Sequence, residues 1–275
     1  MTAGCTAQPR CPPPRAETAA EAELTHDSRQ DELLVLGYHA VSPRWPSALA
    51  AQPDHFERAL TSLIRRGYAP MTFTAAVTGP AKSRRFAVTF DDGYASVLEH
   101  AQPILSQLSV PATVFLVSEA MDGGKNADWG PGVTRWRGTV HEPELQLMNW
   151  DDAASLQDRG WEIGSHTRSH RYLPALEPNS VERELQGSRR TIEDRLGKAC
   201  QSISYPFGGV TPAVAEAAQR AGYLAGAAVN IHPATRWAWP RIDILRADSP
   251  ARFRAKTSGA GEWLRAYQRS RLKTA

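Results

Sequence analysis

Two adjacent carboxylates stand directly after a short apolar segment of the chain. Residues 85–90 read Arg-Phe-Ala-Val-Thr-Phe, and Asp91 and Asp92 follow at once, with Gly93 behind them. Adjacent residues that leave a strand point in different directions, so one carboxylate can bind a metal ion while the other faces water. Asp-Asp-Gly is also ordinary turn chemistry. On its own the pair is therefore either part of a catalytic site or a plain turn.

Two histidines, His166 and His170, follow another apolar segment, residues 161–164. Side chains at i and i+4 converge on one metal ion if the chain turns there as a helix does. Imidazole is a common ligand of zinc, which is the first candidate, and cobalt and nickel are the alternatives. Two surface histidines are the competing interpretation. Together with Asp92 the pair makes a three-ligand set with one position left for water, which is the layout of a catalytic zinc site.

A third histidine, His39, comes soon after the apolar run 33–36, in the sequence Gly-Tyr-His. It is expected at the same end of the fold as the carboxylates and the histidine pair. A core histidine that bonds to a backbone carbonyl is the alternative. His232, which follows the run 224–229, is the remaining histidine with an open role.

The candidate residues need a scaffold that gathers the ends of several strands. Apolar runs of strand type alternate with helical periodicity, and strands are predicted at 33–36, 85–90, 112–117, 161–164, 203–205, 224–229 and 242–245. Such alternation predicts βαβ units and a parallel sheet, hence an α/β chain. About seven or eight units favour a closed β/α barrel, whose active sites lie at the carboxyl ends of the strands.

The rest of the chain divides simply. Residues 1–30 have few large apolar side chains and are predicted to be a disordered tail, which leaves 31–275 as one domain. Residues 119–147 lack periodicity and are predicted to form a long loop over one face. The cysteines, Cys5, Cys11 and Cys200, form no metal or disulfide pattern and are expected to be free thiols.

Composition excludes several classes of protein. A net charge of +3 over 275 residues argues against a nucleic-acid partner. The sequence contains no run of about 18 apolar residues, so it predicts no membrane-spanning helix. The first residues lack the apolar stretch of a secretory leader, which predicts a cytoplasmic protein, or an extracytoplasmic one if a leader has been lost. Nothing in the sequence predicts the oligomeric state.

Three segments give the chain a family resemblance. Residues 89–94, 165–170 and 204–208 read Thr-Phe-Asp-Asp-Gly-Tyr, Ser-His-Thr-Arg-Ser-His and Ser-Tyr-Pro-Phe-Gly. They resemble, in the right order, the first three motifs of the polysaccharide deacetylases with a NodB-homology domain, carbohydrate esterase family four. The resemblance covers most of residues 33–246 and implies a distorted (β/α) barrel of the NodB-homology type.

The resemblance also implies roles for residues in these motifs. Asp91 would be the general base, and the metal would be held by Asp92, His166 and His170. In the third motif, the backbone N–H of Phe207 would help to hold the oxyanion, and Tyr205 would lie with it on the substrate side.

The sequence departs from the family pattern at two places. Many members have an arginine at the position of Ser204 that pairs with the catalytic aspartate, and Arg241 is the candidate replacement. Many members also supply the general acid from a Leu-His motif near the carboxyl end, which this chain lacks. Tyr38-His39 is similar to the Tyr-His motif of the circularly permuted poly-N-acetylglucosamine deacetylases, so the acid role is carried to His39, with His232 or a water as alternatives.

The resemblance implies a metal-dependent hydrolase that removes N-acetyl groups from poly- or oligosaccharides containing N-acetylhexosamine. An O-acetyl esterase or small-amide hydrolase on the same fold, and a degenerate glycan-binding member, are the alternatives. The sugar would rest on flat aromatic rings. Trp129 and Trp136 of the long loop and Trp237 and Trp239 near the last strand are the candidates, and the last two are equally compatible with the core.

Overall fold

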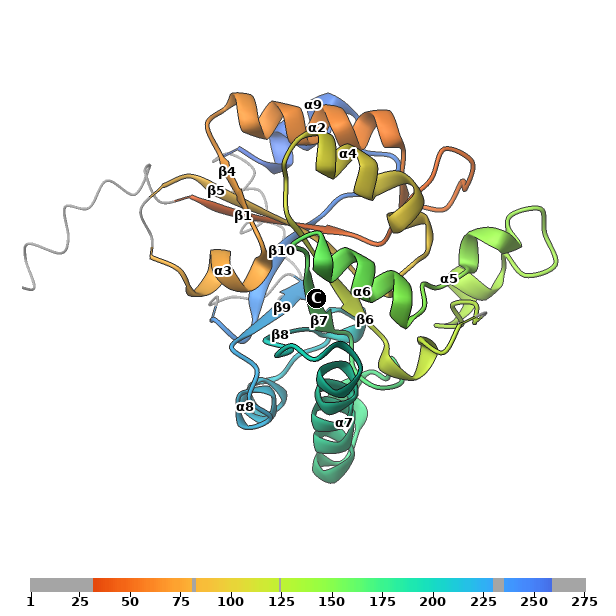
Figure 1. Ribbon diagram of the computed structural model, residues 1–275, viewed down its shortest axis with the longest axis vertical. Coiled ribbons are helices and arrows are strands. Elements are labelled where there is room, and N and C mark those ends of the chain that lie inside the picture. Colours follow the sequence, from red (N-terminus) through yellow and green to blue (C-terminus); the bar gives the residue numbers. More distant parts are fainter. Residues whose placement is uncertain (1–31, 81–82, 124, 230–234, 259–275) are drawn as a thin grey trace, which may run out of the picture.

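The computed structural model of the protein describes residues 32–80, 83–123, 125–229 and 235–258. Parallel strands close into a barrel in the order β1-β5-β6-β7-β8-β9-β10, and β10 pairs with β1 again (Figure 1). The bounds of these strands are β1 Leu33–Tyr38, β5 Arg85–Phe90, β6 Ala112–Leu116, β7 Glu162–Ser165, β8 Ser202–Ser204, β9 Ala225–Val229 and β10 Trp239–Asp243. The predicted α/β barrel is confirmed.

The barrel is distorted beside β5. A further strand, β4 (Ala69–Met71), pairs with residues 85–87 of β5, whereas β6 pairs with residues 88–90 on the same side. Along its other side, β5 pairs with β1 over the whole length of both strands. A small separate sheet of β2 (Ala40–Val41) and β3 (Ala50–Ala51) follows β1.

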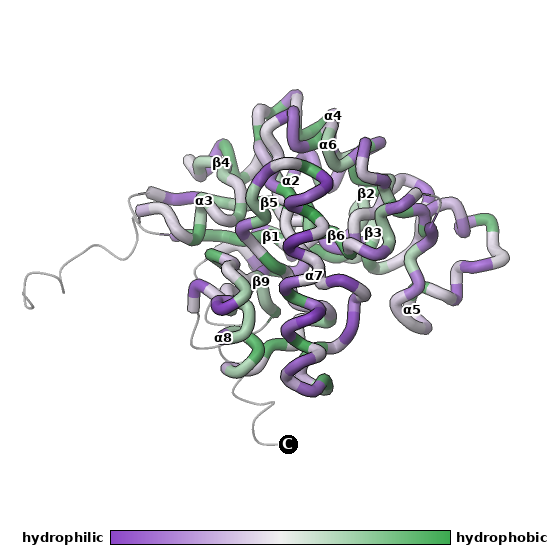
Figure 2. Tube along the Cα trace, turned by 60° about the horizontal axis from the view of Figure 1, so that its bottom comes forward, coloured by the Kyte–Doolittle hydropathy of each residue, from purple (hydrophilic) through white to green (hydrophobic). Residues whose placement is uncertain are grey.

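Helices surround the strands (Figure 1). Their bounds are α2 Pro53–Arg65, α3 Phe73–Thr78, the π-helical η2 Val97–Ala101, α4 Gln102–Gln107, η3 Ser118–Ala120, α5 Pro131–Thr134, η4 Glu142–Leu145, α6 Trp150–Asp158, η5 Leu173–Ala175, α7 Pro178–Leu196, η6 Pro206–Gly208, α8 Pro212–Arg220 and α9 Pro250–Lys256. Most of α7 is hydrophilic (Figure 2), and its buried side chains recur at helical spacing. Cap residues end two of these helices: Thr211 accepts from the N–H of Val214 at the start of α8, and Gly197 ends α7 in the left-handed conformation.

The barrel interior is closed at the amino ends of the strands by α3. This short helix contacts β1, β5 and β9, which lie on different sides of the barrel. The carboxylate of Glu162 in β7 accepts hydrogen bonds from the N–H of Thr74 at 2.9 Å and from the hydroxyl of Thr113 at 3.1 Å. The amino ends are therefore occupied by packing, and the candidate residues stand at the carboxyl ends of the strands.

The predicted loop over residues 119–147 is more ordered than its sequence suggests. It contains α5 and η4, and antiparallel bridges join Tyr94 to Leu147 and Asn126 to Gln146. Its apolar residues form a small core of their own with Trp45 and Tyr94. The burial of these apolar side chains against one another therefore orders the segment beside the carboxyl ends of the strands. Such contacts leave no periodic pattern in the sequence.

The remaining expectations fall partly outside the described residues. Residues 1–30, with Cys5 and Cys11, are outside them, and so is His232. Cys200 is a free thiol, and burial raises its pKa. No helix in the described segments is both long and apolar enough to span a bilayer.

Candidate active site

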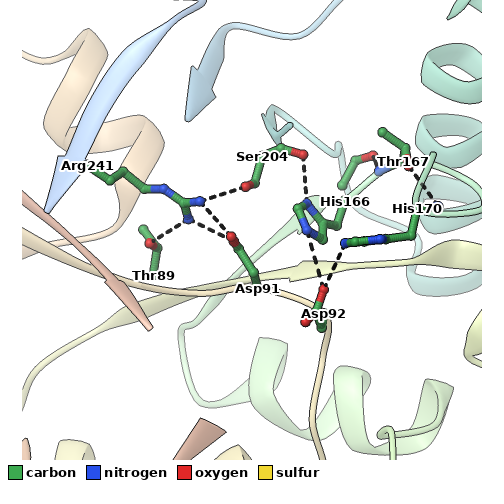
Figure 3. Close-up of polar contacts among 9 residues, drawn as sticks. Thr89, Asp91, Asp92, His166, Thr167, His170, Ser204 and Arg241 are labelled. Atoms are coloured by element: carbon green, nitrogen blue, oxygen red, sulfur yellow. Dashed lines mark hydrogen bonds and ion pairs between the residues drawn. The ribbon is translucent and has the colours of Figure 1, made fainter. Parts of the chain in front are cut away.

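Asp91 and Asp92 leave β5 at its carboxyl end and turn toward different partners (Figure 3). Asp92 has a φ of 69° and Gly93 one of 78°. Aspartate tolerates this left-handed region better than most residues other than glycine. A Cβ on Gly93 would lie 2.9 Å from a methyl carbon of Leu116, so the turn packs tightly against β6. The turn directs Asp91 toward Arg241 and Asp92 toward the histidine pair.

The segment that carries the two histidines is not a helix, although their spacing fits one. Thr167 and His170 have positive φ values of 65° and 57°. The N–H of Thr167 donates to the hydroxyl of Ser165 at 3.1 Å, and the N–H of His170 donates to the hydroxyl of Thr167 at 3.1 Å. The resulting tight turn brings the rings of His166 and His170 to a centroid separation of 4.8 Å.

Glu184 of α7 stabilises this turn by hydrogen bonds to its backbone. Its carboxylate accepts hydrogen bonds from the N–H of Arg168 at 3.0 Å, the N–H of Ser169 at 2.9 Å and the hydroxyl of Ser169 at 2.6 Å. Glu184 was not among the residues predicted from the sequence. A signal was present, since Glu184 lies in the stripe of Val181, Leu185 and other buried residues of α7, where a carboxylate needs partners.

Asp92, His166 and His170 converge at one point (Figure 3). The Oδ1 of Asp92 lies 3.4 Å from Nε2 of His166 and 3.2 Å from Nε2 of His170. All three side chains are buried, and their ligand atoms lie within 4.8 Å of one another. The sequence-predicted ligand set is therefore together in space.

The protonation of this cluster fits a cation. The Nδ1 of His166 lies 2.8 Å from the carbonyl oxygen of Ser204, which can only accept, so Nδ1 carries the proton and Nε2 is left with a lone pair. Burial lowers the pKa of His166 to about 4, which keeps the ring neutral near pH 7. The Oδ1 of Asp92 has no hydrogen-bond donor among the described residues. The lone pair on Nε2 of His166 and those on Oδ1 of Asp92 thus point to one place, as two ligands of a divalent metal ion must.

Asp91 is bound by Arg241, which reaches it from β10. Nη1 of Arg241 donates to Oδ1 at 2.7 Å and Nη2 donates to Oδ2 at 2.6 Å. The same guanidinium donates to the hydroxyls of Thr89 at 3.1 Å and Ser204 at 3.0 Å. Burial raises the pKa of Asp91, but the charge and hydrogen bonds of Arg241, together with His166 and His39, outweigh it and hold the pKa below its ordinary value. Asp91 is therefore ionised at neutral pH.

His39 follows β1 and is half-buried. Burial raises the pKa values of Asp91 and Asp92, and a positive charge on His39 is among the influences that lower them. The same charge opposes the effect of burial on Asp243, whose pKa is raised. His39 thus lies close enough to the carboxylates at the barrel mouth to interact with them.

In the third motif, residues 204–208, the side chain of Phe207 is exposed and that of Tyr205 is buried. Phe207 sits in η6 with its side chain exposed, and its ring meets that of His170 edge-on at 4.8 Å. Tyr205 is fully buried, and its hydroxyl donates to the carbonyl oxygen of Trp237 at 2.7 Å. The Tyr205 side chain is therefore occupied in the fold, contrary to the predicted substrate contact.

Of the four tryptophans considered as sugar-binding residues, some lie at the site and others pack in the fold. Trp239 begins β10 and packs against the cluster inside the barrel near α3, so it lies away from the predicted substrate position. The indole of Trp237 donates to the carbonyl of Tyr223 at 3.0 Å. Trp129 is the one that reaches the site: its ring stacks on that of His170 at 4.7 Å. Trp136 instead packs edge-on against Trp45 at 6.3 Å.

Comparison with known proteins agrees with the fold. The profile of the family described as Polysaccharide deacetylase matches residues 78–226, more than half of the chain. YxkH of Bacillus subtilis (strain 168) is 25% identical over 210 residues, which are 74% of this chain and 67% of that protein. The solved structure of the Streptococcus pyogenes deacetylase PplD in complex with acetate is 21% identical, with a TM-score of 0.68 over 83% of this chain and 99% of that one. IcaB from Ammonifex degensii is also 21% identical, with a TM-score of 0.63 over 82% of this chain and 94% of that one.

The protein is a parallel barrel with an Asp-His-His cluster and an ionised carboxylate at the carboxyl ends of its strands. This arrangement defines a class of barrel proteins in which the site can hold a cation next to a base. Within that class, the chain belongs to the polysaccharide deacetylase family. Members of this family act on acetylated carbohydrate.

Proposed function

We propose that the protein is a metal-dependent deacetylase that hydrolyses the N-acetyl groups of poly- or oligosaccharides containing N-acetylhexosamine. The observation that carries the proposal is the juxtaposition of Asp91, ionised and bound by Arg241, with the Asp92, His166 and His170 cluster. A binding protein without activity would have no need of a buried, ionised base beside three converging ligand atoms. The same juxtaposition argues against the degenerate alternative.

Asp92, His166 and His170 would hold the ion, with zinc as the first candidate and cobalt or nickel as alternatives. A divalent ion there would polarise the acetyl carbonyl and lower the pKa of water. Ser204 fixes the tautomer of His166 through its carbonyl oxygen, and Glu184 fixes the turn that carries His170.

Asp91 would accept the proton of the attacking water. Arg241 occupies both carboxylate oxygens, but each oxygen has a second lone pair, so the base keeps a free acceptor position while its orientation is fixed. The backbone N–H of Phe207 would donate to the oxygen that becomes negative as water adds to the acetyl carbon. These contributions come from groups that are positioned before the substrate arrives.

His39 would complete the reaction as the general acid. When the carbon–nitrogen bond of the amide breaks, the electron pair stays on nitrogen, which must receive a proton to leave as an amine. His39 lies near the carboxylates at the barrel mouth, where it can give that proton. The products are acetate and the free amino sugar.

The test is acetate release from a panel of N-acetylated and O-acetylated glycans. The protein is stripped with a chelator and then reloaded with zinc, cobalt or nickel, and metal content is measured alongside activity. We expect one ion per chain, acetate from N-acetylated glycans only after reloading, and neither in a His166→Ala variant. Acetate from O-acetylated glycans alone would replace the N-deacetylase with an esterase. Undiminished metal content in His166→Ala would reject the ligand assignment.

A further inference from the structure

A pocket of about 140 Å³ lies on the outside of the barrel, between α2 and the segment that runs from the end of β10 into α9. The two helices lie side by side (Figure 1), and we call the space the α2–α9 pocket. The apolar side chains that line it include Phe56, Ala59, Ile244, Leu245 and Phe253. Leu245 is 37% exposed, whereas the other four are buried. No residue placed in the candidate active site lines this pocket, so it is a separate feature of the molecule.

The hydroxyl of Tyr38 is a buried polar group without a partner at this pocket. Tyr38 lines the pocket from the end of β1, is 1% exposed, and its hydroxyl has no hydrogen-bond partner among the described residues. Its ring lies 5.1 Å from that of Phe56 and 5.8 Å from that of Phe90, which fixes the direction of the hydroxyl. Burial and the charge of Asp248, which also lines the pocket, raise the pKa of Tyr38, so the hydroxyl keeps its proton. A buried donor of this kind needs an acceptor, and the pocket is the space from which one can come.

The charged side chains around the pocket favour an anionic ligand. Arg246 and Arg254 line it, and neither forms an ion pair with a carboxylate in the described segments. Asp248 also lines the pocket, but its charge is already met by Nζ of Lys256 at 2.6 Å and by Nε of Arg252 at 3.1 Å. Positive charge at the pocket is therefore not balanced by the carboxylate beside it, which favours a ligand with a negative charge.

The size of the pocket limits what it can hold. A cavity of about 150 Å³ with apolar walls accommodates one benzene ring. The α2–α9 pocket is of this size, and its apolar walls favour a ring or a branched alkyl group over a polar one. A ligand that fits must therefore combine one compact apolar group with an acceptor for the Tyr38 hydroxyl.

We propose that the α2–α9 pocket binds a small organic carboxylate that carries a single ring or a branched alkyl group. The apolar group packs against the buried apolar side chains of the pocket, and the carboxylate accepts a hydrogen bond from the Tyr38 hydroxyl. A carboxylate meets both polar requirements, because it only accepts hydrogen bonds and carries the charge that Arg246 and Arg254 favour. The proposal does not depend on the deacetylase reaction, since the pocket and the candidate active site share no residue.

Calorimetric titration with three probes tests the proposal. Benzoate carries a ring and a charge, benzyl alcohol carries the ring without the charge, and acetate carries the charge without the ring. The full-length protein is first freed of metal with a chelator that is then dialysed away, so that no metal ion binds the carboxylate. The variants are Tyr38→Phe, which removes only the hydroxyl, and Arg254→Gln, which removes one charge. Arg220→Gln is the control, since Arg220 is an exposed arginine on α8, away from α2 and α9 (Figure 1).

We expect benzoate to bind at one site per chain, about tenfold or more tightly than benzyl alcohol or acetate. Tyr38→Phe should weaken benzoate binding by about tenfold, the size of a hydrogen bond to a charged group. Arg254→Gln should weaken it by about two- to fivefold, as expected of an exposed charge, and Arg220→Gln should not weaken it. Because the Tyr38 hydroxyl has no partner in the free protein, Tyr38→Phe should unfold no more readily than the wild type, which distinguishes a ligand-binding role from a structural one.

Three results would overturn the proposal. Absence of saturable benzoate binding would mean that water alone fills the pocket. Equal benzoate affinity of the wild type and Tyr38→Phe, or equally tight binding of benzyl alcohol, would remove the hydroxyl or the charge from the recognition. Loss of benzoate binding in a folded His166→Ala variant would place the benzoate in the candidate active site instead of the α2–α9 pocket.

Discussion

Arg241 and Asp91 form a bidentate ion pair inside the barrel, with Nη1 2.7 Å from Oδ1 and Nη2 2.6 Å from Oδ2. Arg241 lies in β10 and Asp91 directly follows β5, and these two strands flank β1 on its two sides. Gly37 of β1 lies between them, and a Cβ there would be 3.0 Å from Asp243 and 3.7 Å from Arg241. The glycine therefore leaves room for the Asp243 carboxylate, whereas a Cβ would make only ordinary contact with the arginine. Both charged groups are buried, so each depends on the other.

The first prediction concerns this dependence. Arg241→Met should lower the free energy of unfolding by about 3–5 kcal/mol, because the ionised Asp91 would be left buried without its cation. Guanidinium denaturation at pH 7 measures the loss. The double variant Asp91→Asn/Arg241→Met should lose less than the sum of the two single variants, and additive losses would mean that the pair is not coupled.

The second prediction separates the adjacent aspartates. Asp91→Asn should keep the metal and lose activity by about 10²-fold or more, the usual size of a general-base contribution. Asn can still accept from Arg241 through its side-chain oxygen, but some stability should be lost because the arginine charge is no longer balanced. Asp92→Asn is the matched control and should lose the metal itself. If Asp91→Asn empties the site, the two roles must be exchanged.

The sequence predicted the barrel, and it predicted that Asp92, His166 and His170 lie together, because both depend on local patterns. Apolar runs fix strand positions, and residues that follow parallel strands must meet at one end of a barrel. Arg241 was also found, although the last strand was predicted at 242–245 and observed as Trp239–Asp243. Pro240 obscured the strand, since proline within a run usually argues against one. The earlier start puts Trp239 at the amino end of the barrel and explains why it does not reach the site.

Other parts of the site could not be predicted because they depend on tertiary contacts. The positive φ values of Thr167 and His170 are held by hydrogen bonds that include those to Glu184, a residue on a helix well beyond the motif. Nothing in the motif itself reports that partner. Likewise, the exposure of Phe207 follows from the left-handed backbone, which is uncommon for phenylalanine.

The third prediction concerns pH and His166. Burial lowers the pKa of His166 in the folded state to about 4, whereas the unfolded state has an ordinary histidine near 6.5. Between these values the unfolded state binds more protons, so this group makes stability fall as the pH falls. The loss between about pH 6.5 and pH 4 should be on the order of 3 kcal/mol for the metal-free protein.

Denaturation of the metal-free protein across this window, compared with His166→Asn, checks the prediction. The stability difference between wild type and variant should shrink as the pH falls, because asparagine does not titrate. Parallel curves would mean that His166 is already protonated, or that it is not buried as described.

The fourth prediction concerns the turn that carries His170. Glu184→Leu removes the carboxylate, so the N–H groups of Arg168 and Ser169, which both donate to its Oε2, would lose their acceptor. Residues that orient metal ligands typically change metal affinity by about 10–100-fold when they are replaced. We expect a loss of zinc affinity of this size in competition with a chromophoric chelator.

Glu182→Leu is the control on the same helix, where Glu182 is partly exposed and lies 3.9 Å from Arg220. It should bind zinc as the wild type does. Equal zinc affinity in the two variants would show that the turn is preset without Glu184.

The last prediction concerns His39 and the identity of the general acid. An amide leaves as an amine and needs a proton, whereas an activated aryl acetate leaves as a stable anion without one. His39→Ala should therefore keep its metal, lose most hydrolysis of N-acetyl sugars and retain much more of its activity on an aryl acetate. His55→Ala is the matched control, since His55 lies on the outer helix α2, and it should affect neither substrate. Parallel losses on both substrates in His39→Ala would make His39 a positioning residue for the carboxylates. Wild-type hydrolysis of N-acetyl sugars would remove it from the mechanism, and the proton would then have to come from His232 or from water.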